Sequence, residues 1–248
     1  MNLRAWFETD VGLRRESNQD YFLTDDEIGL YIVADGMGGH RGGEVASKMA
    51  AETLREVVKK AVLGSGSRKL NPRVVLSRGY EEASRRVYAA SQEPNANLEG
   101  MGTTLVAAFL FEGTLYIGNV GDSRAYLFTN DRLWQLTEDH SLLNEQLRAG
   151  LVSEADASKY VGKNVITRSV GFERDVQVDI IERVVGPGEL YLLCSDGLYG
   201  MVEDERIAEI CRTHRPEEIV SVCINEAKKQ GGDDNVTVMV LYAEPRSN

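Results

Sequence analysis

The sequence predicts an α+β fold, a layered sandwich in which antiparallel strands pack against segregated pairs of helices. Short β-branched and aromatic runs, bounded by Gly, Asn or Asp, indicate strands. The links between some of these runs are too short for parallel crossovers. Apolar residues at helical spacing occur in paired segments between the groups of strands. These three observations together favour the α+β class.

The predicted strands are apolar runs of strand length. They cover residues 30–35, 103–111, 114–122, 124–128, 176–184, 189–196 and 235–243. Glu112-Gly113 lies between two of these runs, and Asn130-Asp131 follows another. Both are turn sequences of the hairpin type. Because two-residue links join antiparallel neighbours, we expect much of the sheet structure to be antiparallel.

The predicted helices form two pairs. Apolar stripes mark residues 44–62 and 72–91, which lie between two groups of strands. A second pair, residues 203–213 and 216–229, precedes the last strand. We therefore expect each helix pair to cover a sheet.

A more polar stretch, residues 140–165, interrupts the series of strands, and we name it the flap segment. Ser141 and Ser153 are suited to cap two short helices in it. Two interpretations are open. The segment is a plain helical connection, or it is a mobile element that contacts a substrate. Its polarity and its place beside the site discussed below favour the second.

Length and composition predict a single domain over residues 1–248. The chain is long enough for a large core, and its 42% hydrophobic and 27% charged residues are typical of globular proteins. A net charge of -11 argues against a general binder of nucleic acid or anionic membranes. We find no signal-like N-terminus and no apolar run of membrane length. Three cysteines without a CxxC pair favour a reducing, cytoplasmic location.

Aspartates recur at the ends of the predicted strands. They are Asp35, Asp122, Asp196 and the pair Asp233-Asp234. A rigid sheet can fix such carboxylates while their heads reach a common cleft. The alternative is that Asp-Gly is only turn chemistry at each position. Recurrence beside several long apolar strands favours convergence.

Converging carboxylates require cations or protons. Two carboxylates about 4 Å apart repel by ~4 kcal/mol at an effective dielectric of 20. Mg²⁺ and Mn²⁺ prefer such oxygen ligands, whereas scattered histidines and unpaired cysteines disfavour zinc. The glycine-rich loop after Asp35 lacks the GK[ST] ending of a nucleotide-binding loop. Gly36 is expected to let its backbone carbonyl turn toward a metal.

Longer motifs run nearly end to end along the chain in a fixed order. They are TDVGLRRESNQD (9–20), VADGMGGHRGGE (33–44), MGTTLVA (101–107), NVGDSRAY (119–126), LTEDHS (136–141), NVITRSVG (164–171), CSDGL (194–198) and GGDDNVTV (231–238). In these motifs the chain resembles bacterial metal-dependent protein serine/threonine phosphatases of type 2C, the PPM family. The resemblance implies a four-layer α-β-β-α sandwich with a binuclear metal centre at one edge.

The resemblance also assigns ligand roles. Asp35 would bridge two ions, and the Gly36 carbonyl would bind one of them. Asp196 and Asp234 would bind the other ion. Asp122, with Asp196, would supply a weaker third site, as in bacterial members.

Further roles in the resemblance concern groups around the ions. Asp20 would hold metal-bound water, Arg15 would bind the substrate phosphate, and Asn235 would help to orient the site. Animal members carry a histidine after the Asp-Gly as a proposed general acid, but this chain has Met37 there. His40, or a metal-bound water, would then protonate the leaving oxygen.

The resulting prediction is a Mn²⁺- or Mg²⁺-dependent protein serine/threonine phosphatase with two or three ions. Direct attack of a metal-bridging hydroxide would hydrolyse phosphoserine and phosphothreonine. No cysteine has an arginine six residues later, which disfavours a cysteine-dependent phosphatase. Two alternatives are open: a phosphatase for small phosphorylated metabolites, and a non-catalytic regulator that binds phosphoproteins. The presence of every core acid disfavours the regulator.

The expected partners follow from this reaction. They are proteins phosphorylated on serine or threonine, with a cognate kinase among them. We expect no nucleic acid, no membrane and a monomer.

Overall fold

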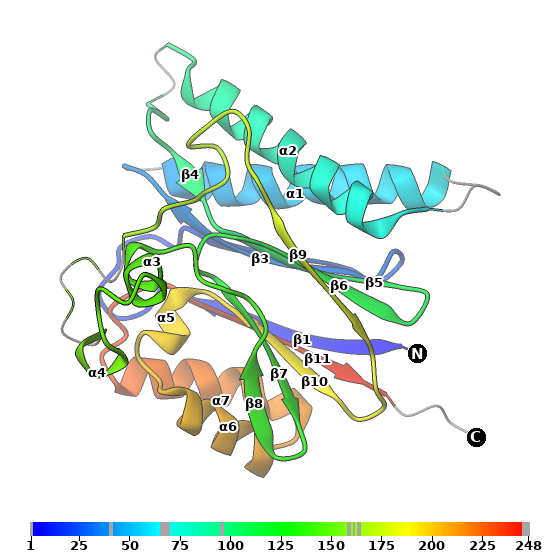
Figure 1. The fold of residues 1–248 in the computed structure, drawn as a ribbon, viewed down its shortest axis with the longest axis vertical. Helices are drawn as coiled ribbons and strands as arrows, with labels where there is room; N and C mark the ends of the chain where they lie inside the picture. The colour runs from blue at the N-terminus through cyan, green and yellow to red at the C-terminus, as the bar shows by residue number, and fades with distance from the viewer. Residues whose placement is uncertain are drawn as a thin grey trace.

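The computed structural model describes residues 2–39, 42–64, 70–94, 97–157, 160, 162 and 165–244. Two antiparallel β-sheets stack face to face, and helices cover the outer face of each (Figure 1). The order of layers is therefore helices, sheet, sheet, helices. This arrangement confirms the predicted four-layer sandwich.

The first sheet, which we call sheet A, has the strand order β1-β11-β10-β7-β8. Its strands are β1 (Leu3–Asp10), β7 (Arg124–Thr129), β8 (Arg132–Gln135), β10 (Leu190–Cys194) and β11 (Val236–Ala243). All neighbouring strands pair antiparallel. Helices α5 (Asp196–Tyr199), α6 (Asp204–Thr213) and α7 (Pro216–Lys229) lie on its outer side (Figure 1).

The second sheet, sheet B, has the order β2-β3-β5-β6-β9, with β4 paired to β3. Its strands are β2 (Asp20–Asp25), β3 (Leu30–Met37), β4 (Gly102–Thr103), β5 (Leu105–Phe111), β6 (Thr114–Val120) and β9 (Asp179–Val184). Helices α1 (Gly42–Gly64) and α2 (Pro72–Ser91) cover it. Each sheet thus carries one of the predicted helix pairs.

The turns follow from the residues that the sequence places in them. Glu112 and Gly113 have φ angles of 48° and 82°, and Asn130 and Asp131 have 50° and 61°. Two successive positive φ values are the geometry of a type I′ turn, which matches the twist of a hairpin. The β5–β6 and β7–β8 hairpins confirm the antiparallel links expected at both places.

The central strands bury both of their faces. In β3, Leu30, Ile32 and Ala34 pack under the helices, whereas Tyr31 and Val33 point into the space between the sheets. Such strands read as continuous apolar runs because side chains alternate between two buried layers. We call the layer between the sheets the inter-sheet core.

Several predicted boundaries were wrong. β3 does not end at Asp35 but continues to Met37, because Gly36 and Met37 pair with β4. Asp196 does not end a strand but begins α5. The edge strands β1, β2 and β8 were not predicted, since their partly exposed residues break the apolar runs.

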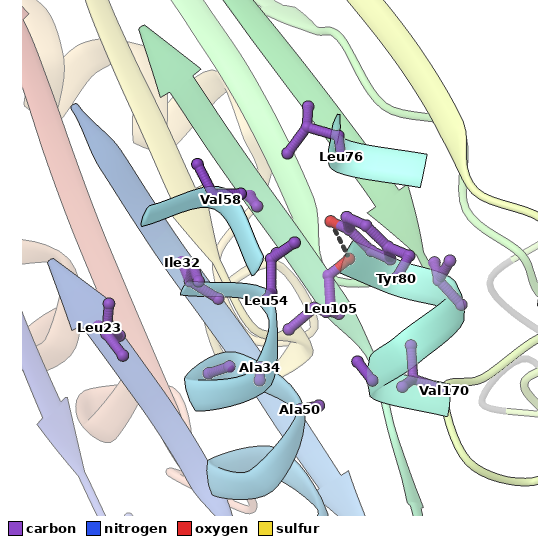
Figure 2. Packing of buried hydrophobic residues seen from close by; sticks show 14 of the residues in the cluster. Leu23, Ile32, Ala34, Ala50, Leu54, Val58, Leu76, Tyr80, Leu105 and Val170 are labelled. Carbon is purple, nitrogen blue, oxygen red and sulfur yellow. Dashed lines mark hydrogen bonds between the residues drawn. The ribbon is translucent and has the colours of Figure 1, made fainter. Parts of the chain in front are cut away.

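A buried tyrosine ties α2 to sheet B. Tyr80 is fully buried, and its hydroxyl donates to the carbonyl oxygens of Gly118 (2.8 Å) and Leu105 (3.2 Å). Figure 2 shows the bond to Leu105 within the cluster that also holds Leu54 and Leu76. A Cβ on Gly118 would meet the Tyr80 ring, so glycine gives the helix room to approach.

Tyr80→Phe should destabilise the protein by about 1 kcal/mol, because two buried carbonyl oxygens lose a donor while packing is kept. For a chain of this size the expected fall in Tm is about 2–4 °C. Calorimetry measures it, with Tyr88→Phe as the control on the half-buried neighbouring turn of α2. Equal shifts for both variants would contradict the hydroxyl's role.

The flap segment contains the two short helices that were expected. α3 (Leu142–Arg148) begins after Ser141, whose side chain accepts from the Asn144 amide, so its predicted cap is confirmed. α4 (Glu154–Ala157) follows Ser153. The two helices lie against each other. Among the described helices, none combines the length and apolar character that crossing a membrane requires.

Candidate metal centre

Five aspartates meet at one end of the sandwich. Asp20 and Asp35 are cross-strand partners on β2 and β3. Asp122 lies in the link that passes from sheet B to sheet A. Asp196 opens α5 directly after β10, and Asp234 precedes β11. Both sheets therefore contribute acids to the same place, as the convergence hypothesis required.

Burial and mutual repulsion raise the pKa values of these carboxyls. Burial raises the pKa of Asp35 well above its ordinary value, and four neighbouring carboxylates raise it further: Asp20, Asp196, Asp122 and Asp234. Burial also raises the pKa of Asp20 to about 7 and that of Asp122 to about 7. For Asp196, burial and then the charge of Asp234 raise the pKa to about 6. The cluster holds more negative charge than this environment favours.

The acids open onto a cleft of about 500 Å³. Asp122, Asp196 and Asp234 line it, together with Ser141 and Leu143 from the start of the flap segment. The larger hollows on the described surface lie elsewhere, between exposed parts of helices or at the far end of sheet B, and hold none of these aspartates. We therefore take the acid cleft as the functional site.

The acid side chains fit divalent metal ions in their chemistry. Asp20 Oδ1 and Asp196 Oδ1 are buried and have no hydrogen-bond partner among the described residues. A buried carboxylate oxygen without a partner is costly, and a hard cation or a water bound to it would satisfy it. No three acid, His or Cys side chains in the described ranges already surround one point. The described residues thus include the oxygen donors that a hard divalent ion prefers.

Two hydroxyls that sequence reasoning missed hold Asp20. Ser195 Oγ and Thr237 Oγ1 each donate to Asp20 Oδ2 at 2.7 Å. Both bonds reach the same oxygen, which leaves Oδ1 as the free acceptor. The alternation of β10 and β11 places these hydroxyls toward the inter-sheet core. Asp20 is therefore oriented but not neutralised.

Gly36 has a packing role in addition to the expected role of its carbonyl, which stays a prediction. Its φ is not in the left-handed region, but a Cβ there would overlap the carbonyl oxygen of Gly43. Gly43 in turn has no room for a Cβ beside Gly36. The two glycines let the start of α1 lie against β3 directly beside Asp35.

Arg15 lies at the acid cluster, where the sequence predicted it. Its Nη2 donates to Asp234 Oδ2 at 2.6 Å, and its side chain is 52% exposed. Asn235 holds the loop that carries Arg15. Its Nδ2 donates to the carbonyls of Val11 and Ser17 at 2.9 Å, and its Oδ1 accepts from the Gln19 amide. Asn235 thus fixes both ends of the loop segment that carries Arg15.

Sequence reasoning also missed Arg124, which lines the cleft. Arg124 forms a forked ion pair with Asp139, with Nη2 and Oδ2 2.7 Å apart. Its guanidinium carbon lies 3.6 Å from the centroid of the Tyr199 ring, and Tyr199 donates to the Asp122 carbonyl. The motif GDSRAY contained Arg124, but only the three-dimensional pairing shows its place.

Two histidines and a cysteine are the other side chains to consider as catalytic groups. His140 is buried and hydrogen-bonded, and burial lowers its pKa. Cys194 packs inside β10, where burial raises the pKa of its thiol and disfavours a thiolate nucleophile. His40, the predicted proton donor, lies outside the described residues.

An α-β-β-α sandwich with carboxylates gathered beside an arginine defines a metal-dependent phosphatase class. The sequence matches the protein phosphatase 2C family over residues 14–227. The serine/threonine phosphatase stp of Listeria innocua is 40% identical over 245 residues, which cover 96% of this chain and 95% of stp. The chain belongs to the protein phosphatase 2C family, whose members are metal-dependent hydrolases.

Solved structures agree with this assignment. The serine/threonine phosphatase PstP/Ppp of Mycobacterium tuberculosis superposes with a TM-score of 0.88 at 32% identity, covering 99% of this chain and all of that one (100%). A second structure, the PstP catalytic domain in complex with 2 manganese ions, gives 0.86 at 32% identity, covering 98% and 99% of the two chains. The fold prediction and the family resemblance are both confirmed.

Proposed function

We propose that this chain hydrolyses phosphoserine and phosphothreonine in proteins with two or three Mn²⁺ or Mg²⁺ ions. The observation that carries the proposal is the meeting of five mutually repelling aspartates, three of which line one cleft and one of which pairs with Arg15. Membership of the protein phosphatase 2C family and the manganese in a related structure support it.

Each acid has a proposed place around the ions. Asp35 would contribute to both main ions, the Gly36 carbonyl would help to hold one of them, and Asp196 and Asp234 would hold the other. Asp122, with Asp196, would hold a third, weaker ion. The partnerless oxygen of Asp196 supports a ligand role. The partnerless Oδ1 of Asp20 supports the role of holding water beside the ions.

When bound, the ions would offset the carboxylate charge and would supply Lewis acidity, which lowers the pKa of water and favours hydrolysis of a phosphate ester. Arg15 offers two parallel N–H donors to phosphate oxygens, a geometry that lysine does not match. Its exposure of 52% leaves it accessible to a substrate. Asn235 fixes the Arg15 loop, and Asp20 orients water through its free oxygen.

Asp122→Ala should lower kcat by about tenfold or more, equivalent to ~1.4 kcal/mol in the barrier, while the two main ions stay bound. The reason is that Asp122 belongs only to the weaker third site. Turnover of a phosphothreonine peptide and calorimetric Mn²⁺ titration measure the two effects. Asp131→Ala, in the exposed β7–β8 turn, is the control. Loss of all ions from Asp122→Ala would contradict this division of roles.

The substrate class is tested by direct comparison. We expect kcat/KM for a phosphothreonine peptide to exceed that for small phosphorylated metabolites by at least about tenfold, since remote contacts of a larger substrate add to transition-state binding. Asp35→Asn serves as the blank. Equal or faster turnover of a metabolite would favour the small-molecule alternative.

A cognate kinase among the substrates, a monomeric state and a single domain over residues 1–248 stay predictions. A cytoplasmic location is supported by three free, buried cysteines, which suit a reducing compartment. His40 as proton donor also stays a prediction.

A further inference from the structure

His140 holds the backbone of the residue that precedes Asp122. The Gly121 amide donates to His140 Nδ1 at 3.0 Å, and the His140 amide donates to the Gly121 carbonyl at 3.0 Å. His140 thus forms hydrogen bonds with both the amide and the carbonyl of Gly121, one through its side chain and one through its main chain. His140 is only 7% exposed, so water does not compete for these bonds.

The contact with Gly121 determines the tautomer of the ring. A backbone amide only donates, so Nδ1 must be the unprotonated nitrogen. The proton of the neutral ring is then on Nε2, which donates to Asp179 Oδ2 at 3.2 Å. Arg168 Nη1 lies 2.9 Å from Nε2, but it has acceptors for both of its hydrogens in Asp179 Oδ1 (2.9 Å) and the Gln177 carbonyl (3.2 Å), so it does not require Nε2 as an acceptor. Asp179 therefore orients the imidazole and keeps Nδ1 aimed at Gly121.

Gly121 is a position that only glycine fits. Its φ is +101°, and a Cβ would overlap the side chain of Thr104. At the next residue, the Tyr199 hydroxyl donates to the Asp122 carbonyl at 2.9 Å. The Asp122 backbone is thus held from both sides, by His140 through Gly121 and by Tyr199 directly.

His140 also closes the base of the flap segment. The Thr167 amide donates to the His140 carbonyl at 2.9 Å, and the Leu142 amide donates to the Val165 carbonyl at 2.8 Å. A further bridge pairs Ser141 with Ile166. The two ends of the flap segment therefore meet at the same residue that grips Gly121.

We infer that His140 is a positioning residue that sets Asp122 for the third metal site and connects that site to the base of the flap segment. The inference rests on the proposed function. His140 does not touch the substrate or donate a proton to it, because Nδ1 accepts from Gly121 and Nε2 faces Asp179. Its effect on the reaction passes through the Asp122 backbone.

Two amide substitutions separate the two ring nitrogens. The side-chain oxygen in His140→Asn takes the place of Nδ1 and keeps an acceptor for Gly121, whereas His140→Gln places its amide near Nε2 and leaves Gly121 without one. We expect His140→Gln to weaken the third-site affinity for Mn²⁺ by about 10–100-fold with the two tight ions retained, as is usual for partners of metal ligands. His140→Asn should stay within about threefold of wild type, and so should the control His214→Ala, at the end of α6.

The measurement is a Mn²⁺ titration of the full chain, followed by electron paramagnetic resonance of the free ion, with Tm recorded for each variant. Excess Mn²⁺ should restore turnover in His140→Gln, which a merely structural defect would not allow. Wild-type third-site affinity in His140→Gln, or an equal loss in His140→Asn, would overturn the inference. If His140→Gln does not fold, His140→Ala supplies the same comparison. A wild-type chain that binds no Mn²⁺ would overturn the proposed function itself.

Discussion

Replacing Asp35 by asparagine is expected to reduce kcat by at least about 10³-fold, equivalent to ~4 kcal/mol in the activation barrier. Asp35 is the acid whose pKa is raised by all four of the other aspartates, which places it centrally among them. An amide has nearly the same shape but lacks the charge needed to join two cations. Turnover of a phosphothreonine peptide at saturating Mn²⁺ measures the loss.

Stability distinguishes this loss from misfolding. Burial raises the folded-state pKa of Asp35 above its unfolded value, so ionising it near pH 7 destabilises the metal-free protein. Asp35→Asn removes that cost and should raise Tm in the presence of a chelator. Asp175→Asn, at a largely exposed aspartate, should alter neither activity nor Tm. Asp35→Asn that is folded and retains more than a tenth of wild-type turnover would refute the central role.

Complete removal of divalent ions should stop turnover and lower Tm. At a Mn²⁺ concentration 100 times Kd, binding to the folded state alone adds about 2.7 kcal/mol. For a chain of this length that is about 5–10 °C in Tm. The ions stabilise because they offset carboxylates that burial and mutual repulsion disfavour.

The chelation experiment uses calorimetry and peptide turnover in parallel, with ions returned at the end. Asp35→Asn is its matched control and should show little or no rise in Tm with Mn²⁺. Turnover that survives full chelation would be incompatible with the proposed chemistry. So would a Tm that does not respond to Mn²⁺ in the wild-type chain.

The sequence predicted the central strands because both of their faces are buried. Residues 30–35 and 235–243 read as apolar runs, and the structure has β3 and β11 there. The edge strands β1 and β8 were not predicted because none of their residues is fully buried, so neither reads as an apolar run. The helix pairs were predicted nearly to their ends, because each has a continuous apolar stripe toward one sheet.

The acids of the site were visible in the sequence, whereas their supports were not. Asp35 and Asp196 stand out because a charge follows a long apolar run. Ser195 and Thr237 do not, since a hydroxyl beside a strand is unremarkable until the pairing of β10 and β11 brings it to Asp20. The same holds for His140, whose partner Gly121 is 19 residues away in the chain.

The acids are divided between the two sheets, with Asp35 on β3 of sheet B, and Asp196 and Asp234 in the segments that follow β10 and precede β11 of sheet A. The distance between the carboxylates of the two sheets therefore depends on the thickness of the inter-sheet core. Val33, Leu193 and Met239 belong to this core. Close-packed interiors transmit small changes in volume as displacements. The thickness of the core would therefore determine the spacing of the proposed ions. A substitution that changes the volume of a core residue, far from any substrate, would therefore change kcat before it lowered the stability of the fold.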